Sequence, residues 1–313
     1  MKAVFFGTPE FAVPSLEALL SVASVPLVLT QPDRPVGRHA EPVPSPVARR
    51  AQAAGLEVVK PSRLGGNREL LARLEAAAPD VGVVVAYGRI LPPEILAVPR
   101  LGFVNVHASL LPRHRGASPV QAALLAGDAE TGVVTMRVVE ELDAGPLYLA
   151  RRVPIRPTDD AGLLSHRLSR EGAALLVETL RGLERGALEP AAQRGEPTFC
   201  RPLRRGDGEV DWRTPAEEIA RRLRAFSPWP GLFTFLGGER IKLLAADAVS
   251  GSSDLEPGVL ARAGDQAVVG AGGGTALVLR RVQREARTPV SGAEFLRGLP
   301  DVPARLGRQA AGG

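Results

Sequence analysis

Residues 101–116, LGFVNVHASLLPRHRG, join an apolar run to a loop that is dense in polar and basic side chains. The run is interrupted by Asn105 and predicts the last part of a buried strand. Because side chains alternate along a strand, Asn105 and His107 are expected on the same side. An amide and a titratable imidazole then meet at the carboxyl end of a strand, where open α/β sheets bind ligands. This layout suits chemistry on a polarised carbonyl, although such a pair alone also fits a capped turn with a hydrogen-bonded histidine.

A second strand end favours the functional interpretation. Residues 133–139, VVTMRVV, predict a strand, and the turn EELDAG at 140–145 places Asp143 shortly after it. A carboxylate beside an imidazole is expected to hold the imidazolium and to raise the proton affinity of His107. An amide and an imidazolium together can stabilise an oxyanion. The sequence therefore predicts a catalytic acid–base set formed by Asn105, His107 and Asp143.

Strands and helices alternate through the first part of the chain. We expect strands at 2–7, 25–30, 56–59 and 81–86, and helices at 15–20, 46–54, 68–78 and 165–181. This alternation predicts an α/β fold with a doubly wound, mostly parallel, Rossmann-like sheet. The opening turn at Gly7 lacks the GxGxxG pattern, so a nicotinamide or flavin site is not expected.

The character of the sequence changes after residue 190. Residues 191–206 are polar, with two prolines and several arginines, and predict a linker. A helix is expected at 217–224, followed by short β runs at 233–236, 241–245, 258–261, 267–270 and 275–282. Short strands at that spacing predict a small OB-like β-barrel. We therefore expect an N-terminal catalytic domain at 1–190, a linker at 191–206 and a C-terminal barrel domain at 207–313.

Composition narrows the class of protein. The chain has 313 residues, of which 45% are hydrophobic and 23% charged, as in globular proteins of two domains. The apolar run at the N-terminus is too short for a signal peptide or a membrane span, so we expect a cytoplasmic protein without membrane contact. A single cysteine, Cys200, permits no intramolecular disulfide, and no metal site is expected. Residues 190–313 hold 18 basic against 14 acidic residues, which points weakly to a polyanionic partner.

The motif Asn-x-His-x-Ser-Leu-Leu-Pro-x-x-Arg-Gly at 105–116, followed by Asp143, resembles the folate-dependent formyltransferases. Further segments similar to that family run from the N-terminus past residue 230. They include FGTPEFA at 6–12, QPDRP at 31–35, VAYG at 85–88, GDAETG at 127–132, VDW at 210–212 and RAFSPWP at 224–230. The first, second and last of these segments favour the members of the family that formylate a charged tRNA.

The resemblance implies an activity and a set of site residues. The formyl group of 10-formyltetrahydrofolate, a co-substrate, would move to the α-amino group of methionyl-initiator tRNA without a metal, in a protein that we expect to be monomeric. Catalysis would fall to Asn105, His107 and Asp143, with His107 protonated when it stabilises the oxyanion. The implied folate-binding residues are Ser109, Leu110, Leu111, Pro112, Val85, Tyr87 and Gly88, and the implied tRNA-binding residues are Arg34, Arg38, Arg204 and Arg205. Tyr87 fits equally well as an aromatic ring packed on the sheet edge.

Some positions depart from the family pattern. Glu141 stands where glycine is common and Ala144 where threonine is common, and both flank Asp143. His114 replaces a frequent aromatic residue, and we expect it to be exposed. The basic loop around Arg38 lacks a lysine pair and contains Glu41.

Other functions remain open at the level of the sequence. A formyltransferase for a small amine, such as a nucleotide-linked amino sugar or glycinamide ribonucleotide, would share the three catalytic residues but not the basic C-terminal part. A 10-formyltetrahydrofolate hydrolase would use water in place of the amine. A tRNA-binding protein that has lost catalysis would not need the intact Asn105, His107 and Asp143 set.

Overall fold

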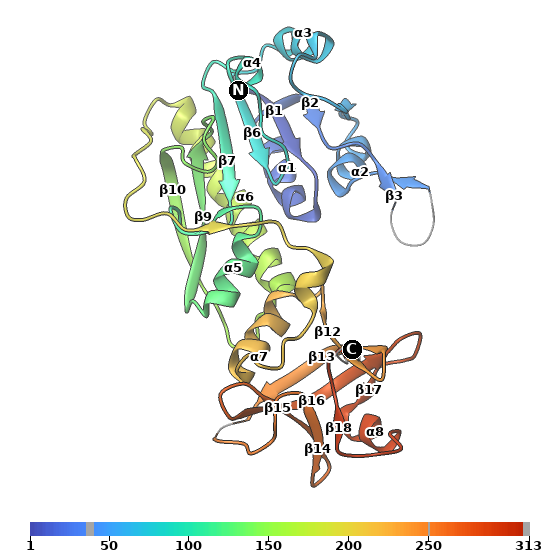
Figure 1. Ribbon diagram of the computed structural model, residues 1–313. Helices are drawn as coiled ribbons and strands as arrows, with labels where there is room; N and C mark the ends of the chain where they lie inside the picture. The colour runs from blue at the N-terminus through green and yellow to red at the C-terminus, as the bar shows by residue number, and fades with distance from the viewer. Residues whose placement is uncertain (36–40, 250, 309–313) are drawn as a thin grey trace. The chain divides into compact units, whose positions relative to one another are not determined.

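A mixed β-sheet forms the centre of the N-terminal unit (Figure 1). The computed structural model describes residues 1–35, 41–249 and 251–308, and within them this sheet has seven strands in the order β5, β2, β1, β6, β7, β9, β10. The strands from β5 to β7 are parallel, β9 runs antiparallel to β7, and β10 runs antiparallel to β9. Their bounds are Val58–Val59, Ser24–Leu29, Lys2–Gly7, Val81–Val85, Phe103–His107, Glu130–Arg137 and Leu147–Pro154.

Helices cover both faces of this sheet. Phe5 and Val104 point to one face and pack in a core with residues of α1 (Val13–Leu20), α2 (Pro46–Ala53) and α6 (Ala161–Glu184). Phe6 and Phe103 point to the other face, against α3 (Arg68–Ala77) and α4 (Pro93–Leu96). Strands that are buried on both sides read as continuous apolar runs, which is why their positions follow from the sequence. The prediction of a doubly wound, mostly parallel sheet is confirmed.

Neither strand β10 nor helix α5 (Pro119–Ala126) is predicted by the sequence patterns. Strand β10 carries Arg151 and Arg152 at its centre, and these side chains pair with Glu171 and Glu130. The charges interrupt the apolar pattern that identifies the other strands. Helix α5, most of which clusters with the C-terminal unit, is apolar except for Gln121 and shows no helical periodicity. Strand β9 was expected at 133–139 but begins at Glu130 and ends at Arg137, so Val138 and Val139 belong to the following loop.

The C-terminal unit is an antiparallel barrel. Its strands follow the order β12, β13, β16, β15, β14, β18, and a bridge between Leu236 and Leu306 brings the end of β12 to the residue after β18. Their bounds are Leu232–Leu236, Glu239–Ala248, Thr275–Arg284, Gln266–Ala271, Val259–Ala263 and Ala304–Arg305. The unit also contains α7 (Ala216–Ala225), α8 (Gly292–Arg297), β17 (Val290–Ser291) and the 3-10 turn η2 (Arg205–Gly208). The predicted small barrel is therefore confirmed.

Neither unit is one continuous stretch of the sequence. Residues 1–120, 129–155 and 163–201 cluster in the first unit, and residues 121–128, 156–162 and 202–313 in the second. The domain limits of 1–190, 191–206 and 207–313 stay a prediction. Shorter elements of the first unit are the 3-10 turn η1 (Glu10–Ala12) and the ribbon of β3 (Arg34–Pro35) with β4 (Pro42–Val43). Across the described residues, the helices are too short or too polar to cross a membrane.

Candidate active site

Strand β7 carries Asn105 and His107 to the carboxyl end of the parallel strands. Asn105 lies between Val84 of β6 and Met136 of β9 in the sheet register. The two residues share a face with Phe103, as alternation along the strand predicts. Asn105 is half-buried, and among the described residues its side-chain amide has no hydrogen-bonding partner. His107 is buried, with 6% of its surface exposed.

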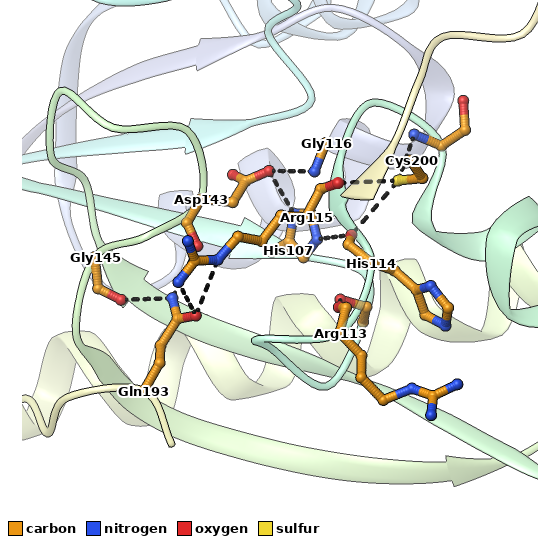
Figure 2. A network of polar contacts seen from close by, with 11 residues as sticks. His107, Arg113, His114, Arg115, Gly116, Asp143, Gly145, Gln193 and Cys200 are labelled. Atoms are coloured by element: carbon orange, nitrogen blue, oxygen red, sulfur yellow. Dashed lines mark hydrogen bonds and ion pairs between the residues drawn. The ribbon is translucent and has the colours of Figure 1, made fainter. Parts of the chain in front are cut away.

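The imidazole of His107 lies between two oxygen atoms (Figure 2). Its Nε2 is 3.0 Å from the backbone carbonyl oxygen of His114, and its Nδ1 is 3.6 Å from Oδ2 of Asp143. A carbonyl oxygen can only accept, so Nε2 carries the proton in this contact. Burial lowers the pKa of His107, and this effect outweighs the Asp143 carboxylate and the His114 carbonyl, which favour the imidazolium. The expectation that the Asp143 carboxylate raises the proton affinity of His107 is confirmed, but burial outweighs this effect, so the pKa of His107 lies below its ordinary value.

Asp143 belongs to the loop between β9 and β10. Its backbone adopts a φ of 50°, in the left-handed region that Asp tolerates better than most residues. The carboxylate oxygen Oδ2 accepts a hydrogen bond of 2.8 Å from the backbone N–H of Gly116. Strand β8 (Arg115–Gly116) thus holds the carboxylate beside His107. Local sequence motifs place Asp143 near the histidine, whereas this backbone contact, between residues distant in sequence, orients its carboxylate.

The loop after β7 is shaped by its own side chains. Ser109 is fully buried, and its hydroxyl donates to the carbonyl of Arg113 at 2.6 Å. Leu111 is buried against Val134 and Met136 of β9. Pro112 is also buried, whereas Leu110 is half-buried. The predicted folate-binding residues of this loop therefore build its shape, and their contact with folate stays a prediction.

The Val85–Gly88 segment presents mainly backbone. The side chain of Tyr87 is buried in the core, edge-on to Phe6, and burial raises its pKa to about 12. Its backbone carbonyl accepts hydrogen bonds from the Gln31 amide at 2.8 Å and from the Thr8 hydroxyl at 3.2 Å. The structure thus favours the packed-ring interpretation of Tyr87. Any contact of this segment with a ligand would come from backbone atoms, including those of Gly88.

Residues 191–200 run beside the catalytic loops, and we call them the strap. Its strand β11 (Phe199–Cys200) pairs with β8. The side chain of Gln193 lies between the guanidinium of Arg115 and the turn that contains Asp143 and Gly145 (Figure 2). No sequence pattern points to Gln193, because a single glutamine in a polar stretch forms no motif. Cys200 is half-buried, and burial raises the pKa of its thiol.

Two residues that depart from the family pattern, His114 and Glu141, contact residues of this cluster. His114 was expected to be exposed, but 8% of its surface is accessible, and its carbonyl faces His107. Glu141 is exposed and pairs with Arg115 at 3.2 Å. The loop therefore compensates the extra carboxylate with a basic side chain instead of leaving it beside Asp143.

The predicted tRNA-binding arginines lie outside this cluster. Arg34 is exposed on β3, and its guanidinium donates to Gln31 at 2.9 Å. Arg38 falls outside the described residues. Arg204 and Arg205 are exposed in the C-terminal unit, and within the described ranges neither guanidinium has an acidic partner.

Comparison with known proteins agrees with this geometry. Residues 1–180 match the formyl transferase family, and residues 202–300 match the C-terminal domain of formyl transferases. The chain is 47% identical over 309 residues to a methionyl-tRNA formyltransferase of Thermus thermophilus, covering 98% of this chain and 100% of that protein. It is 45% identical over 311 residues to a protein of the same name from Koribacter versatilis, covering 98% and 99%.

Solved structures share the fold at low identity. HypX from Aquifex aeolicus, in complex with tetrahydrofolic acid, has a TM-score of 0.61 and 19% identity over 96% of this chain. The chain spans about half the length of HypX, 48%. The sugar 3N-formyl transferase WlaRD has a TM-score of 0.66 and 16% identity, covering 92% of this chain and 99% of WlaRD. Both family models and the full-length likeness to curated relatives show that this chain belongs to the formyl transferase family, among the methionyl-tRNA formyltransferases.

Proposed function

We propose that the protein transfers the formyl group of 10-formyltetrahydrofolate to the α-amino group of methionyl-initiator tRNA, which makes formylmethionyl-tRNA for translation initiation. The observation that carries this proposal is the cluster of Asn105, His107 and Asp143 in a chain that aligns along its whole length with methionyl-tRNA formyltransferases. The tetrahydrofolic acid bound to HypX supports the class of donor. We propose a cytoplasmic monomer, and light scattering of the purified protein tests its mass in solution.

The reaction exchanges one bond to the formyl carbon for another. The neutral α-amino nitrogen attacks that carbon, and the carbonyl electron pair moves onto oxygen to give a tetrahedral oxyanion. Collapse of this intermediate breaks the bond to N10 of the folate. The attacking nitrogen loses a proton and N10 gains one, so the site must stabilise the oxyanion and move a proton. Neither task requires a metal.

We assign the oxyanion to Asn105. Its side-chain amide lies at the carboxyl end of β7, half-buried, and is not engaged by a protein acceptor among the described residues. An amide that is already partly desolvated and not engaged by a protein acceptor is available to donate to a developing negative charge. One such donor typically contributes about 3 kcal/mol to transition-state stabilisation.

We assign the proton to the pair formed by His107 and Asp143. Both ring nitrogens of His107 face protein oxygens, so the carboxylate of Asp143 is the better-placed group to take the proton from the amine and return it to N10. His107 stabilises the pair and, when protonated, adds positive charge near the oxyanion. Acid–base assistance of this kind contributes about 10²–10⁴-fold to the rate.

The remaining predicted residues would bind the two substrates. We propose that the loop from Ser109 to Pro112 and the backbone of Val85–Gly88 border the folate. Arg34, Arg38, Arg204 and Arg205 would contact the phosphates of the tRNA, because arginine binds phosphate through paired N–H groups.

The test is transfer of radiolabelled formyl from 10-formyltetrahydrofolate, with charged methionyl-initiator tRNA, uncharged tRNA, free methionine and small amines as alternative acceptors. Label on methionyl-tRNA alone is the expected result. Label on a small amine, or its release as formate, would keep the catalytic cluster but overturn the tRNA assignment.

The variant Asn105→Ala should lose about 10²–10³-fold in kcat, since it removes one oxyanion donor. Wild-type activity in that variant would exclude the assigned role of Asn105.

A further inference from the structure

The strap is fixed at both ends to the segments that carry the catalytic residues. At its start, Ala191 exchanges two backbone hydrogen bonds with Leu147, of 2.7 and 2.8 Å, at the beginning of β10. Near its end, the carbonyl of Thr198 accepts from the N–H of Arg115 at 2.8 Å, and the carbonyl of Cys200 accepts from Ala117 at 3.1 Å. Gln193 is therefore held between the loop after β7 and the loop after β9.

Gln193 uses both ends of its side-chain amide. The nitrogen Nε2 donates to the backbone carbonyl of Asp143 and to that of Gly145, each at 2.8 Å. The oxygen Oε1 accepts from Nη2 of Arg115 at 2.8 Å and from its Nε at 3.3 Å. The reversed amide would place N–H groups against a guanidinium and an oxygen against two carbonyls. The surrounding groups therefore fix the orientation of the amide.

The turn that Gln193 binds needs such support. Asp143 has left-handed backbone geometry, and a non-glycine residue in that region is held there by its surroundings. Its carboxylate oxygen Oδ2 accepts a hydrogen bond from the backbone N–H of Gly116 at 2.8 Å and lies 3.6 Å from Nδ1 of His107. Gly116 directly follows Arg115, the residue that Gln193 contacts. One side chain thus links the backbone that bears the carboxylate to the strand that orients it (Figure 2).

We propose that Gln193 is a positioning residue for Asp143, which sets the distance between its carboxylate and the imidazole of His107 by tying the 143–145 turn to Arg115. The catalytic consequence rests on the proposed function, whereas the geometric consequence does not. Misplacement of a catalytic group by about 1 Å can cost on the order of 10²-fold in rate.

Two substitutions separate the contacts of Gln193. Gln193→Leu removes all of its hydrogen bonds at similar size. Gln193→Glu keeps an acceptor for Arg115 but sets carboxylate oxygens against the carbonyls of Asp143 and Gly145. Arg194→Ala is the control in the strap, because Arg194 is exposed and makes no contact with this cluster among the described residues. Gln52→Leu is the matched control for residue type, since Gln52 is exposed on α2.

Each variant is measured for kcat, for the KM of both substrates, for Tm, and for the titration of His107 by NMR in the free protein. We expect both Gln193 variants to lose about 10–100-fold in kcat while both KM values change less than about threefold. In Gln193→Leu, displacement of Asp143 withdraws its stabilising charge from the imidazolium, so the His107 titration should move to lower pH than in the wild type. Gln193→Glu is judged by kcat, because its new carboxylate itself favours the imidazolium. The two controls should match the wild type in every readout.

The outcomes distinguish this inference from the proposed function. If Gln193→Leu retains wild-type kcat and the wild-type His107 titration, or if Gln193→Glu retains wild-type kcat, the contacts of Gln193 with the 143–145 turn do not position Asp143 and the inference is overturned. A lower Tm with unchanged kcat and titration would overturn it as well, because it shows support of the fold alone. If the wild type transfers no formyl group to methionyl-tRNA, the proposed function fails, and the His107 titration still decides whether Gln193 positions Asp143.

Discussion

At the scale of single residues, opposing effects set the protonation state of the buried His107 imidazole. Burial disfavours the imidazolium, whereas the Asp143 carboxylate and the His114 carbonyl favour it, and the balance lowers the pKa of His107. Catalysis at neutral pH thus starts from a histidine that is less often protonated than one in water. The negative charge of Asp143 partly offsets the effect of burial, because it favours the imidazolium form of His107.

Stability should depend on pH through this residue. The pKa of His107 is lower in the folded protein than the value of 6.5 for the free side chain, so the unfolded chain binds the proton first as pH falls. The free energy of unfolding should therefore decrease as pH drops below 6.5 and level off below the pKa of the folded state. Urea unfolding of the wild type and of His107→Asn, repeated at several pH values, measures the two slopes. Equal slopes in both proteins would show that burial does not control this titration.

Sequence and structure agree on the placement of Asn105, His107 and Asp143 for a simple reason. Alternation along a strand fixes which face Asn105 and His107 share, and a turn after the next strand brings Asp143 close. No comparable local rule predicts the proton affinity of a side chain or the hydrogen bonds between residues distant in sequence. The lowered pKa of His107, the burial of Tyr87 and the contacts of Gln193 all depend on residues distant in sequence, so the sequence could not predict them.

At the scale of elements, the short parallel pair of β8 and β11 connects the catalytic loop to the strap. Gly116 of β8 has a φ of 118°, and a Cβ at this position would overlap the carbonyl oxygen of Cys200 in β11. Only glycine allows the strands to approach this closely while its N–H still reaches Asp143. This two-residue pair therefore orients the carboxylate of Asp143.

The variant Gly116→Ala tests that conclusion. The new methyl group must separate β8 from β11, which moves the Gly116 N–H away from Asp143, so we expect a loss of both stability and kcat. Gly55→Ala is the control, because Gly55 also has a positive φ, 71°, but open space at the Cβ position. Backbone strain of this kind costs about 1–3 kcal/mol, and Gly55→Ala should show only that cost in urea unfolding. If the two variants lose equal stability and Gly116→Ala keeps wild-type kcat, close packing of the two strands has no catalytic role.

The elements that the sequence predicts correctly are those with one strong pattern. The parallel strands are apolar throughout because helices cover both faces of the sheet, and barrel strands are marked by regular turns. Strand β10 was not identified because Arg151 and Arg152 break its apolar pattern and are neutralised by glutamates of other elements. Short pairs such as β8 with β11 depend on tertiary contacts and leave no periodic signal in two residues.

At the scale of the whole molecule, the chain combines a catalytic unit with a basic barrel unit, and each matches a formyl transferase family model. Five arginines of the barrel unit are paired with acidic side chains of the same unit. They are Arg213, Arg280, Arg284, Arg305 and Arg308. Arginines without such partners in the described residues, among them Arg204 and Arg205, are therefore the better candidates for phosphate contacts.

Salt dependence of tRNA binding measures those contacts directly. Each phosphate contact releases counterions from the nucleic acid, so removal of one contact should reduce the slope of log Kd against log salt by about 1. We expect the double variant Arg204→Ala with Arg205→Ala to bind methionyl-tRNA more weakly and with a reduced slope, at unchanged affinity for the folate. Arg305→Ala is the control, because the guanidinium of Arg305 is paired with Glu256 and should contribute little to the slope. A reduced slope in Arg305→Ala, with a wild-type slope in the double variant, would place the phosphate contacts on another surface of the barrel unit.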